Sequence, residues 1–209
     1  MQKIFFKQKN YGFTIIETMI AISLFLVVVL IGMGALLNAS MLHQKAQNIR
    51  SLIDNLSFTM EDMSRNLRTG YDYRCIGATT ANTDLIYDIG KSQSSKSGET
   101  CAGIAFESST GDPSNDNDQW VYYIDNGKIL KSTQAPYSLL IPSSLSPYVQ
   151  LTPDDINIDP ASGFFILGAE SGDDQQPFVT IRLVGNIHYK NTDTPFNLQT
   201  SVSQRLLDK

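Results

Sequence analysis

The chain has 209 residues, a length that accommodates one membrane-spanning helix and one modest globular domain. Three of its 16 basic side chains lie in the first twelve residues, so the rest of the chain carries 13 basic and 21 acidic side chains. This acidic balance excludes the Lys/Arg-rich surface that nucleic-acid phosphates require, and we expect no direct nucleic-acid binding.

The first element in chain order is a short basic leader, residues 1–12, which precedes an apolar run that extends to Leu37. Between Lys9 and Lys45 the only charged side chain is that of Glu17. A carboxylate in hydrocarbon costs about 2–4 kcal/mol even on lenient insertion scales, so it requires a partner or a function. An ordinary secretory signal, with an apolar core of about 7–15 residues, is shorter than this run. A plain membrane anchor accounts for the length but not for Glu17.

The junction between the leader and the apolar run resembles the processing motif of the type IV pilin and pseudopilin family. The residues that carry the resemblance are Gly12-Phe13-Thr14-Ile15-Ile16-Glu17. The resemblance implies that a prepilin peptidase cuts between Gly12 and Phe13 and that the new amino group of Phe13 is methylated. It also implies a role for Glu17 in assembly. It is specific from Gly12 to the end of the apolar run and diffuse beyond.

The resemblance implies a structural subunit rather than an enzyme: a minor pilin or pseudopilin of a type IV pilus, a competence pilus or a type II secretion pseudopilus. The implied partners are the prepilin peptidase, other pilins or pseudopilins in a filament, the inner-membrane assembly platform and membrane lipid. Segments 122–130 and 197–205 also resemble, more weakly, the J-type minor pseudopilins and the W-type minor pilins. Two alternatives remain: a static single-pass membrane protein with an extracytoplasmic binding domain, and a membrane-tethered hydrolase.

The helical pattern continues past the apolar run, because no proline occurs between Phe13 and Gly70. It predicts one long spine helix with Gly70 as its C-terminal cap. Beyond the apolar run, apolar residues at spacings of three and four form one stripe of an amphipathic helix. The stripe consists of Ile49, Leu52, Ile53, Leu56, Met60, Met63 and Leu67. We therefore expect residues 13–42 in the membrane or a filament core, and residues 43–69 against their own domain.

After Gly70 the apolar pattern changes to a period of two, which predicts short strands. The expected strands cover 84–89, 103–106, 120–124, 129–131, 156–158, 164–167, 178–184 and 196–202. Asn126-Gly127 predicts a type I′ hairpin turn, since both positions of that turn have positive φ. The sequence thus predicts an α+β fold, with the spine helix packed on an antiparallel sheet. The basic leader indicates the cytoplasmic side, and residues 70–209 are expected to form an extracytoplasmic domain of a single-pass inner-membrane protein.

The chain has two cysteines, Cys75 and Cys101, both in the expected extracytoplasmic domain. An even number of cysteines in an oxidising compartment favours one disulfide. The alternative is two buried free thiols.

Candidate catalytic and metal-binding residues are few. His43 and His188 have no partner motif that indicates catalysis, and no nucleophile elbow, P-loop or zinc-protease motif occurs. The one calcium candidate is an acidic loop with oxygen ligands at alternate positions. Its members are Asp112, Ser114, Asp116 and Asp118. It lacks the glycine and the closing glutamate of a calcium loop, so an exposed acidic loop is the favoured interpretation and no cofactor is expected.

Overall fold

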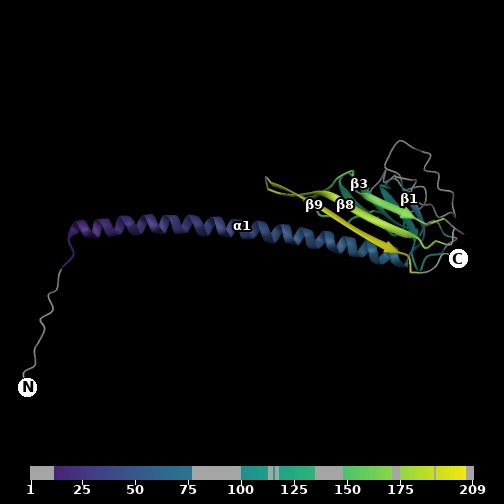
Figure 1. Ribbon diagram of the computed structural model, residues 1–209, viewed down its shortest axis with the longest axis horizontal. Coiled ribbons are helices and arrows are strands. Elements are labelled where there is room, and N and C mark those ends of the chain that lie inside the picture. Colours follow the sequence, from purple (N-terminus) through teal and green to yellow (C-terminus); the bar gives the residue numbers. More distant parts are fainter. Residues whose placement is uncertain are drawn as a thin grey trace, which may run out of the picture. The chain divides into compact units, whose positions relative to one another are not determined.

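The structure is a computed structural model of the 209-residue chain (Figure 1). It describes residues 12–76, 100–112, 115, 118–134, 148–170, 175–190 and 192–205. The chain divides into two units, Met1–Gln47 and Asn48–Lys209. The expected strand at 84–89 lies outside the described residues.

One long helix, α1 (Ile15–Thr69), contributes to both units, and the strands belong to the second. The predicted end of the helix at Gly70 is confirmed: the N–H of Gly70 donates to the carbonyl of Asn66 at 2.9 Å. The φ angle of Gly70 is not positive, so this cap is not of the left-handed type. Glycine is required there for space, since a Cβ atom would lie 2.4 Å from Cδ2 of Phe106.

The last carbonyl groups of α1 are satisfied by side-chain and backbone donors from the domain. The hydroxyl of Tyr73 lies within hydrogen-bonding distance of the carbonyl oxygens of Leu67 and Gly70. The N–H of Arg205 donates to the carbonyl of Arg68 at 2.8 Å. Because a helix end leaves four carbonyl groups without intrahelical partners, these contacts fix the helix end to the domain.

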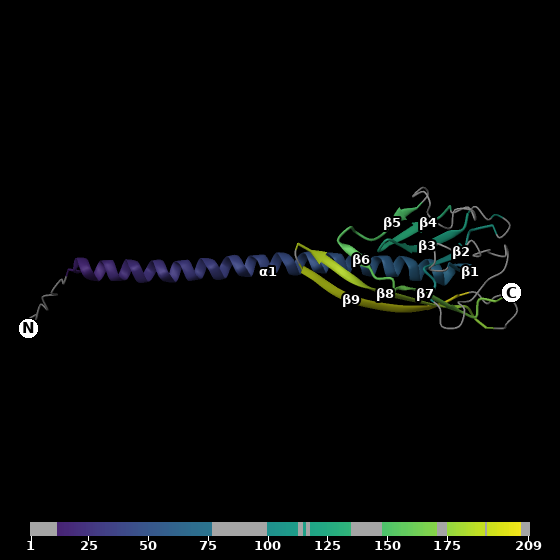
Figure 2. The same cartoon turned by 90° about the horizontal axis from the view of Figure 1, so that it is seen from above.

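Two antiparallel sheets flank the C-terminal segment of α1 (Figure 2). The first has the order β1-β2-β3-β4-β5, and β3 and β4 are joined by the predicted hairpin, with φ of 47° at Asn126 and 74° at Gly127. Its strands are β1 (Tyr71–Ile76), β2 (Gly103–Glu107), β3 (Trp120–Asp125), β4 (Lys128–Ser132) and β5 (Val149–Gln150).

The second sheet is organised around one long strand, β8, which runs beside β9 over its full length (Figure 1). On its other edge β8 pairs with β6 near one end and with β7 near the other. The strands are β6 (Ile156–Ile158), β7 (Gly163–Leu167), β8 (Phe178–Tyr189) and β9 (Thr192–Ser203). The α+β fold and its antiparallel pairing are as predicted.

Several strand boundaries differ from the prediction. The strands β8 and β9 are each 12 residues long and extend beyond the predicted ranges. The strand β1 was not predicted; Asp72 has a φ of 54° and the pairing register shifts between Tyr71 and Arg74, so the alternation is interrupted by a bulge. Within β8, Gly185 is needed because a Cβ atom there would lie 2.2 Å from the carbonyl oxygen of Asn157 in β6.

The hydrophobic core joins the amphipathic stripe of α1 to the inner faces of both sheets. Leu56 and Met63 on the helix have no exposed surface, and neither do Phe164 and Ile181 on the second sheet. Ile53, which was assigned to the same stripe, is instead 41% exposed. The opposite face of the first sheet carries a second buried cluster, formed by Ile76, Ala105, Val121, Tyr123, Leu130 and Tyr148.

A polar network also links α1 to the first sheet. The carboxylate of Asp62 accepts hydrogen bonds from the Tyr122 hydroxyl and from the Lys131 ammonium group, each at 2.8 Å. Asn66 donates to the same hydroxyl at 2.7 Å, and Lys131 lies 4.8 Å from the centre of the Trp120 ring. Burial alone would raise the pKa of Asp62, but the hydrogen bonds and the charge of Lys131 outweigh it, and the pKa is lowered.

The lowered pKa of Asp62 predicts a loss of stability in acid. A carboxylate with a depressed folded-state pKa contributes stability above its unfolded pKa, and this contribution is lost as pH falls through the folded-state pKa. We expect Lys131→Met to lower the melting temperature at neutral pH and to reduce its further fall below about pH 4. Lys190→Met, at the turn between β8 and β9, removes the same charge and is the control. Identical acid profiles for the two variants would contradict this role for Lys131.

Candidate functional site

The first turn of α1 is closed by Thr14, the residue directly before the helix. The N–H of Glu17 donates to the hydroxyl oxygen of Thr14 at 3.3 Å, and the N–H of Thr18 donates to the Thr14 carbonyl at 3.2 Å. A threonine cap with glutamate three residues later is the capping-box pattern. Glu17 also lies where the partial positive charge of the helix N-terminus favours a carboxylate. The helix start is therefore determined locally, by Thr14 and Glu17.

Thr14 was not identified as a functional residue from the sequence, although the signal was present. A serine or threonine followed three residues later by glutamate, just before an apolar run, predicts a helix N-terminus. The interpretation of Glu17 as an isolated charge in an apolar segment obscured this second relation.

The Gly12–Phe13 peptide bond lies outside the helix, which begins at Ile15. Phe13 is 80% exposed, and no atom lies within 4 Å of the position that a Cβ atom of Gly12 would occupy. An exposed, non-helical peptide bond with a small residue on one side is the kind of backbone that a protease can bind. Gly12 and Phe13 thus lie just before the helix, and Glu17 lies in its first turn.

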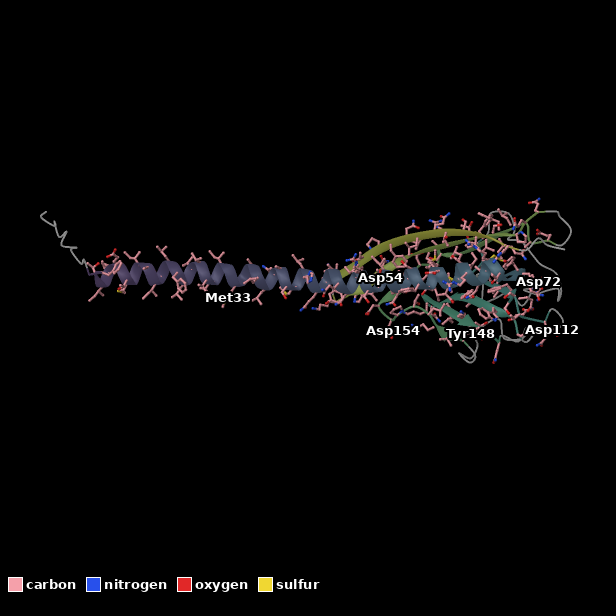
Figure 3. The ribbon with its side chains drawn as sticks, turned by 90° about the horizontal axis from the view of Figure 1, so that it is seen from below. Met33, Asp54, Asp72, Asp112, Tyr148 and Asp154 are labelled. Atoms are coloured by element: carbon pink, nitrogen blue, oxygen red, sulfur yellow. A yellow bond between two sulfur atoms is a disulfide. The ribbon has the colours of Figure 1, made fainter. Side chains whose placement is uncertain are left out.

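The helix that follows is apolar on every side. Between Phe13 and Leu42 all of its large hydrophobic side chains except Val29 are more than half exposed in the isolated chain, and Figure 3 shows side chains projecting all around the helix, with Met33 labelled. This segment is long and apolar enough to cross a membrane. Such a surface requires lipid or other helices around it.

A comparison with protein families agrees with this geometry. The family model for the prokaryotic N-terminal methylation motif matches residues 7–33, which include the junction, Glu17 and most of the apolar run. Over these residues the chain is similar to type IV pilin-like proteins. No curated protein and no solved structure matches it.

The match supports a type IV pilin-like substrate of prepilin peptidase, with methylation of the new N-terminus and assembly into filaments. Together with the apolar helix, it fits a protein anchored in the membrane by a single span. Type IV pilin-like proteins are structural rather than catalytic.

The two cysteines of the pilin-like chain are joined in a disulfide, with their Cα atoms 5.4 Å apart. Cys75 lies in β1 of the first sheet. Cys101, just before β2, exchanges backbone hydrogen bonds of 2.8 and 2.9 Å with Phe164 in β7 of the second sheet. The bond therefore lies where the two sheets meet.

The calcium candidate is only partly described. The N–H of Asp112 donates to the Asp118 carboxylate at 3.0 Å, so these two residues are close, whereas Ser114 and Asp116 lie outside the described residues. Within the described ranges, no group of three or more His, Cys, Asp or Glu side chains has the arrangement of a metal site.

The two histidines lie apart from the N-terminal motif in the sequence, and each has its own neighbour. His43 lies 3.0 Å from the Gln47 amide, one turn along α1. The Nδ1 atom of His188 lies 2.6 Å from the Asp193 carboxylate across the exposed turn between β8 and β9. Each histidine thus has a hydrogen-bonding neighbour close to it in the sequence.

The disulfide can be tested by thiol labelling. We expect denatured, unreduced protein to show no free thiol, and two after reduction. Because the bond closes a loop with a sequence separation of 26 residues, the chain-entropy relation gives a stabilisation of about 3.5 kcal/mol. The double variant Cys75→Ser/Cys101→Ser should unfold at lower denaturant concentration by a corresponding amount. Stoichiometric labelling of both cysteines before reduction would refute the bond.

Proposed function

We propose that this protein is a minor pilin or pseudopilin: a subunit that is stored in the inner membrane, cut after Gly12, methylated at Phe13 and assembled into a filament. The observation that carries the proposal is the placement of Glu17. It is the only charge in the apolar run, and it lies in the first helical turn, directly after an exposed glycine junction. A membrane anchor needs the apolar helix but has no use for this carboxylate or this junction.

The proposed orientation follows from charge. Three lysines and no acid occupy the leader, whereas the rest of the chain is acidic, so the positive-inside rule favours a cytoplasmic leader and an extracytoplasmic domain. A disulfide between Cys75 and Cys101 is consistent with an oxidising compartment. In this proposal residues 13–42 enter the membrane and the filament core, residues 43–69 support the domain, and residues 70–209 face outward.

The proposed partners are those of a filament subunit: the prepilin peptidase, neighbouring pilins or pseudopilins, the inner-membrane assembly platform and lipid. The size of the β-rich domain favours a larger minor subunit, of the J or W type, over a major filament-forming pilin. A type IV pilus, a competence pilus and a type II secretion pseudopilus all fit such a subunit.

Processing at the junction gives the first test. We expect the N-terminal residue of the mature chain to be Phe13, because Gly12 is the small residue at an exposed, non-helical peptide bond. Gly12→Leu should leave a precursor about twelve residues longer on a gel, the length of the leader. Gly34→Leu, a matched change at an exposed glycine inside the apolar run, should be cut normally. An intact Met1 on the mature wild-type chain would support a static membrane protein instead.

Cleavage would give Glu17 a charged partner. The new amino group of Phe13 would lie four residues before Glu17, just outside the helical turn that contains Glu17. Glu17 can then pair with this amino group or with that of a neighbour displaced along the filament. The attraction is far stronger in hydrocarbon than in water, although desolvation offsets much of it. Pairing between subunits would favour insertion in the correct register.

Replacing the carboxylate separates this role from helix capping. Glutamine serves in a capping box as glutamate does, so Glu17→Gln removes the charge and keeps the cap, whereas Glu17→Ala removes both. We expect both variants to be cut and held in the membrane, and to be depleted from sheared filaments on immunoblots. Glu61→Gln, on the same helix outside the apolar run, should be incorporated normally. If only Glu17→Ala is depleted, the cap rather than the charge is required.

A further inference from the structure

The loop between β2 and β3 starts from a buried charged residue. Glu107, the last residue of β2, is 2% exposed, and Gln119, directly before β3, is 1% exposed. The side-chain amide of Gln119 donates a hydrogen bond to the Glu107 carboxyl group. A carboxyl group this deeply buried requires hydrogen bonds or a compensating charge for all its oxygen atoms.

A second carboxylate approaches the same loop. Asp118 accepts a hydrogen bond of 3.0 Å from the N–H of Asp112. The oxygen Oε2 of Glu107 lies so close to the preceding residue, Gly111, that a Cβ atom there would be 2.8 Å away from it. The carboxylates of Glu107 and Asp118 therefore lie next to two consecutive loop residues, Gly111 and Asp112.

Tyr71 in β1 lies close to the same group of carboxylates. Its hydroxyl donates to the Gly111 carbonyl at 3.2 Å. Burial raises the pKa of Tyr71, and four nearby carboxylates raise it further. These belong to Glu107, Asp118, Asp72 and Asp112, the last two of which are labelled at the same end of the domain in Figure 3.

Three oxygen atoms in this cluster are buried and accept no hydrogen bond: Glu107 Oε2, Asp118 Oδ1 and Gln119 Oε1. All three are acceptors, and they come from two carboxylates and one carboxamide. Buried acceptors without donors are rare in native proteins, because each loses its hydration without compensation. Oxygen atoms of these types are the ligands that Ca²⁺ takes in proteins.

The charges around Glu107 leave this carboxyl group short of positive charge. Burial raises its pKa to about 7; the Gln119 hydrogen bond and the charge of Arg74 act in the opposite direction but are outweighed by burial and by Asp118 and Asp72. A bound cation would supply the missing charge.

We propose that Glu107, Asp118 and Gln119 form a calcium site, in which Glu107 Oε2, Asp118 Oδ1 and Gln119 Oε1 coordinate one Ca²⁺ ion. The site ties the end of β2 to the start of β3 and differs from the alternate-position loop pattern visible in the sequence. It does not depend on the proposed role in a filament.

A single proton satisfies this cluster less completely than a cation does. A proton on Glu107 Oε2 turns that atom into a donor for one acceptor and leaves the other acceptor without a partner. One Ca²⁺ ion takes all three oxygen atoms as ligands, and it accepts irregular geometry and additional water ligands.

The full-length chain in detergent provides the test, with Ca²⁺ alone and Tb³⁺ alone as probes. Ca²⁺ at a hundred-fold excess over its Kd should raise the melting temperature by roughly 5–10 °C. Trp120, the single tryptophan, follows Gln119 directly. Excitation of this indole should therefore sensitise the luminescence of bound Tb³⁺, and Ca²⁺ should displace it.

Two variants locate the site. Glu107→Gln and Asp118→Asn each remove one ligand charge with little change in shape, and each should abolish the Ca²⁺-dependent rise and the Tb³⁺ luminescence. Because two ligand variants are used, the test remains valid if one of them folds poorly. Asp193→Asn, at the exposed turn between β8 and β9, removes the same charge elsewhere and should behave as the wild type.

Three outcomes would overturn the proposal. The first is a wild-type chain that responds to neither ion, and the second is full binding by both ligand variants. The third is a pH effect without any metal effect. Since the pKa of Glu107 is raised to about 7, its protonated form would stabilise the fold at low pH, and this stability would be lost as pH rises through about 7 in the wild type but not in Glu107→Gln. That result would assign the site to a proton.

Discussion

The structure depends on a helix that must satisfy two different surroundings. From Phe13 to Leu42 apolar side chains lie all around the helix, and all of the large ones except Val29 are more than half exposed. From Leu52 to Leu67 only one stripe is buried, and two sheets cover it. The hydrophobic effect acts on both segments, but the partner differs: lipid or other helices for the first, the chain's own domain for the second. A proline in either segment would interrupt the helix. A broad polar face in the first segment would prevent its burial in lipid or among other helices.

Capping contacts fix both ends of α1, the end near the apolar segment and the end inside the domain. At the start, the hydroxyl of Thr14 accepts from the Glu17 N–H, downstream of the Gly12–Phe13 bond. Cleavage of that bond would leave this contact and the Thr18–Thr14 hydrogen bond in place, because neither of these two described contacts uses a leader residue. At the other end, Tyr73 and Arg205 contact the last carbonyl groups from within the domain. Each end is thus fixed by groups that remain in the mature chain.

The sequence predicts the helix, most of the described strands and the junction, because these features have strong local signals. The helix has unbroken apolar periodicity and no proline, and the hairpin at Asn126-Gly127 needs two residues that tolerate positive φ. The junction places a glycine, an apolar residue and a lone glutamate in a fixed order. Each signal is contained within a few residues, so it can be identified without knowledge of the rest of the fold.

The missed features depend on contacts between segments that are distant in the chain. The requirement for glycine at position 70 comes from Phe106, and the lowered pKa of Asp62 comes from Lys131. The bulge in β1 interrupts the alternation that would have predicted that strand. No pattern among neighbouring residues in the sequence indicates any of these three features.

Glu107 illustrates the same limit most clearly. In the sequence it is one acid directly after the expected strand 103–106, and no motif marks it. In the structure it is 2% exposed, because β1, the loop at Gly111 and Gln119 all approach it. The acidic loop attracts attention in the sequence because its oxygen ligands alternate along the chain, whereas the burial of Glu107 depends on residues from other parts of the fold. Burial, rather than the number of acids, determines where a compensating cation is needed.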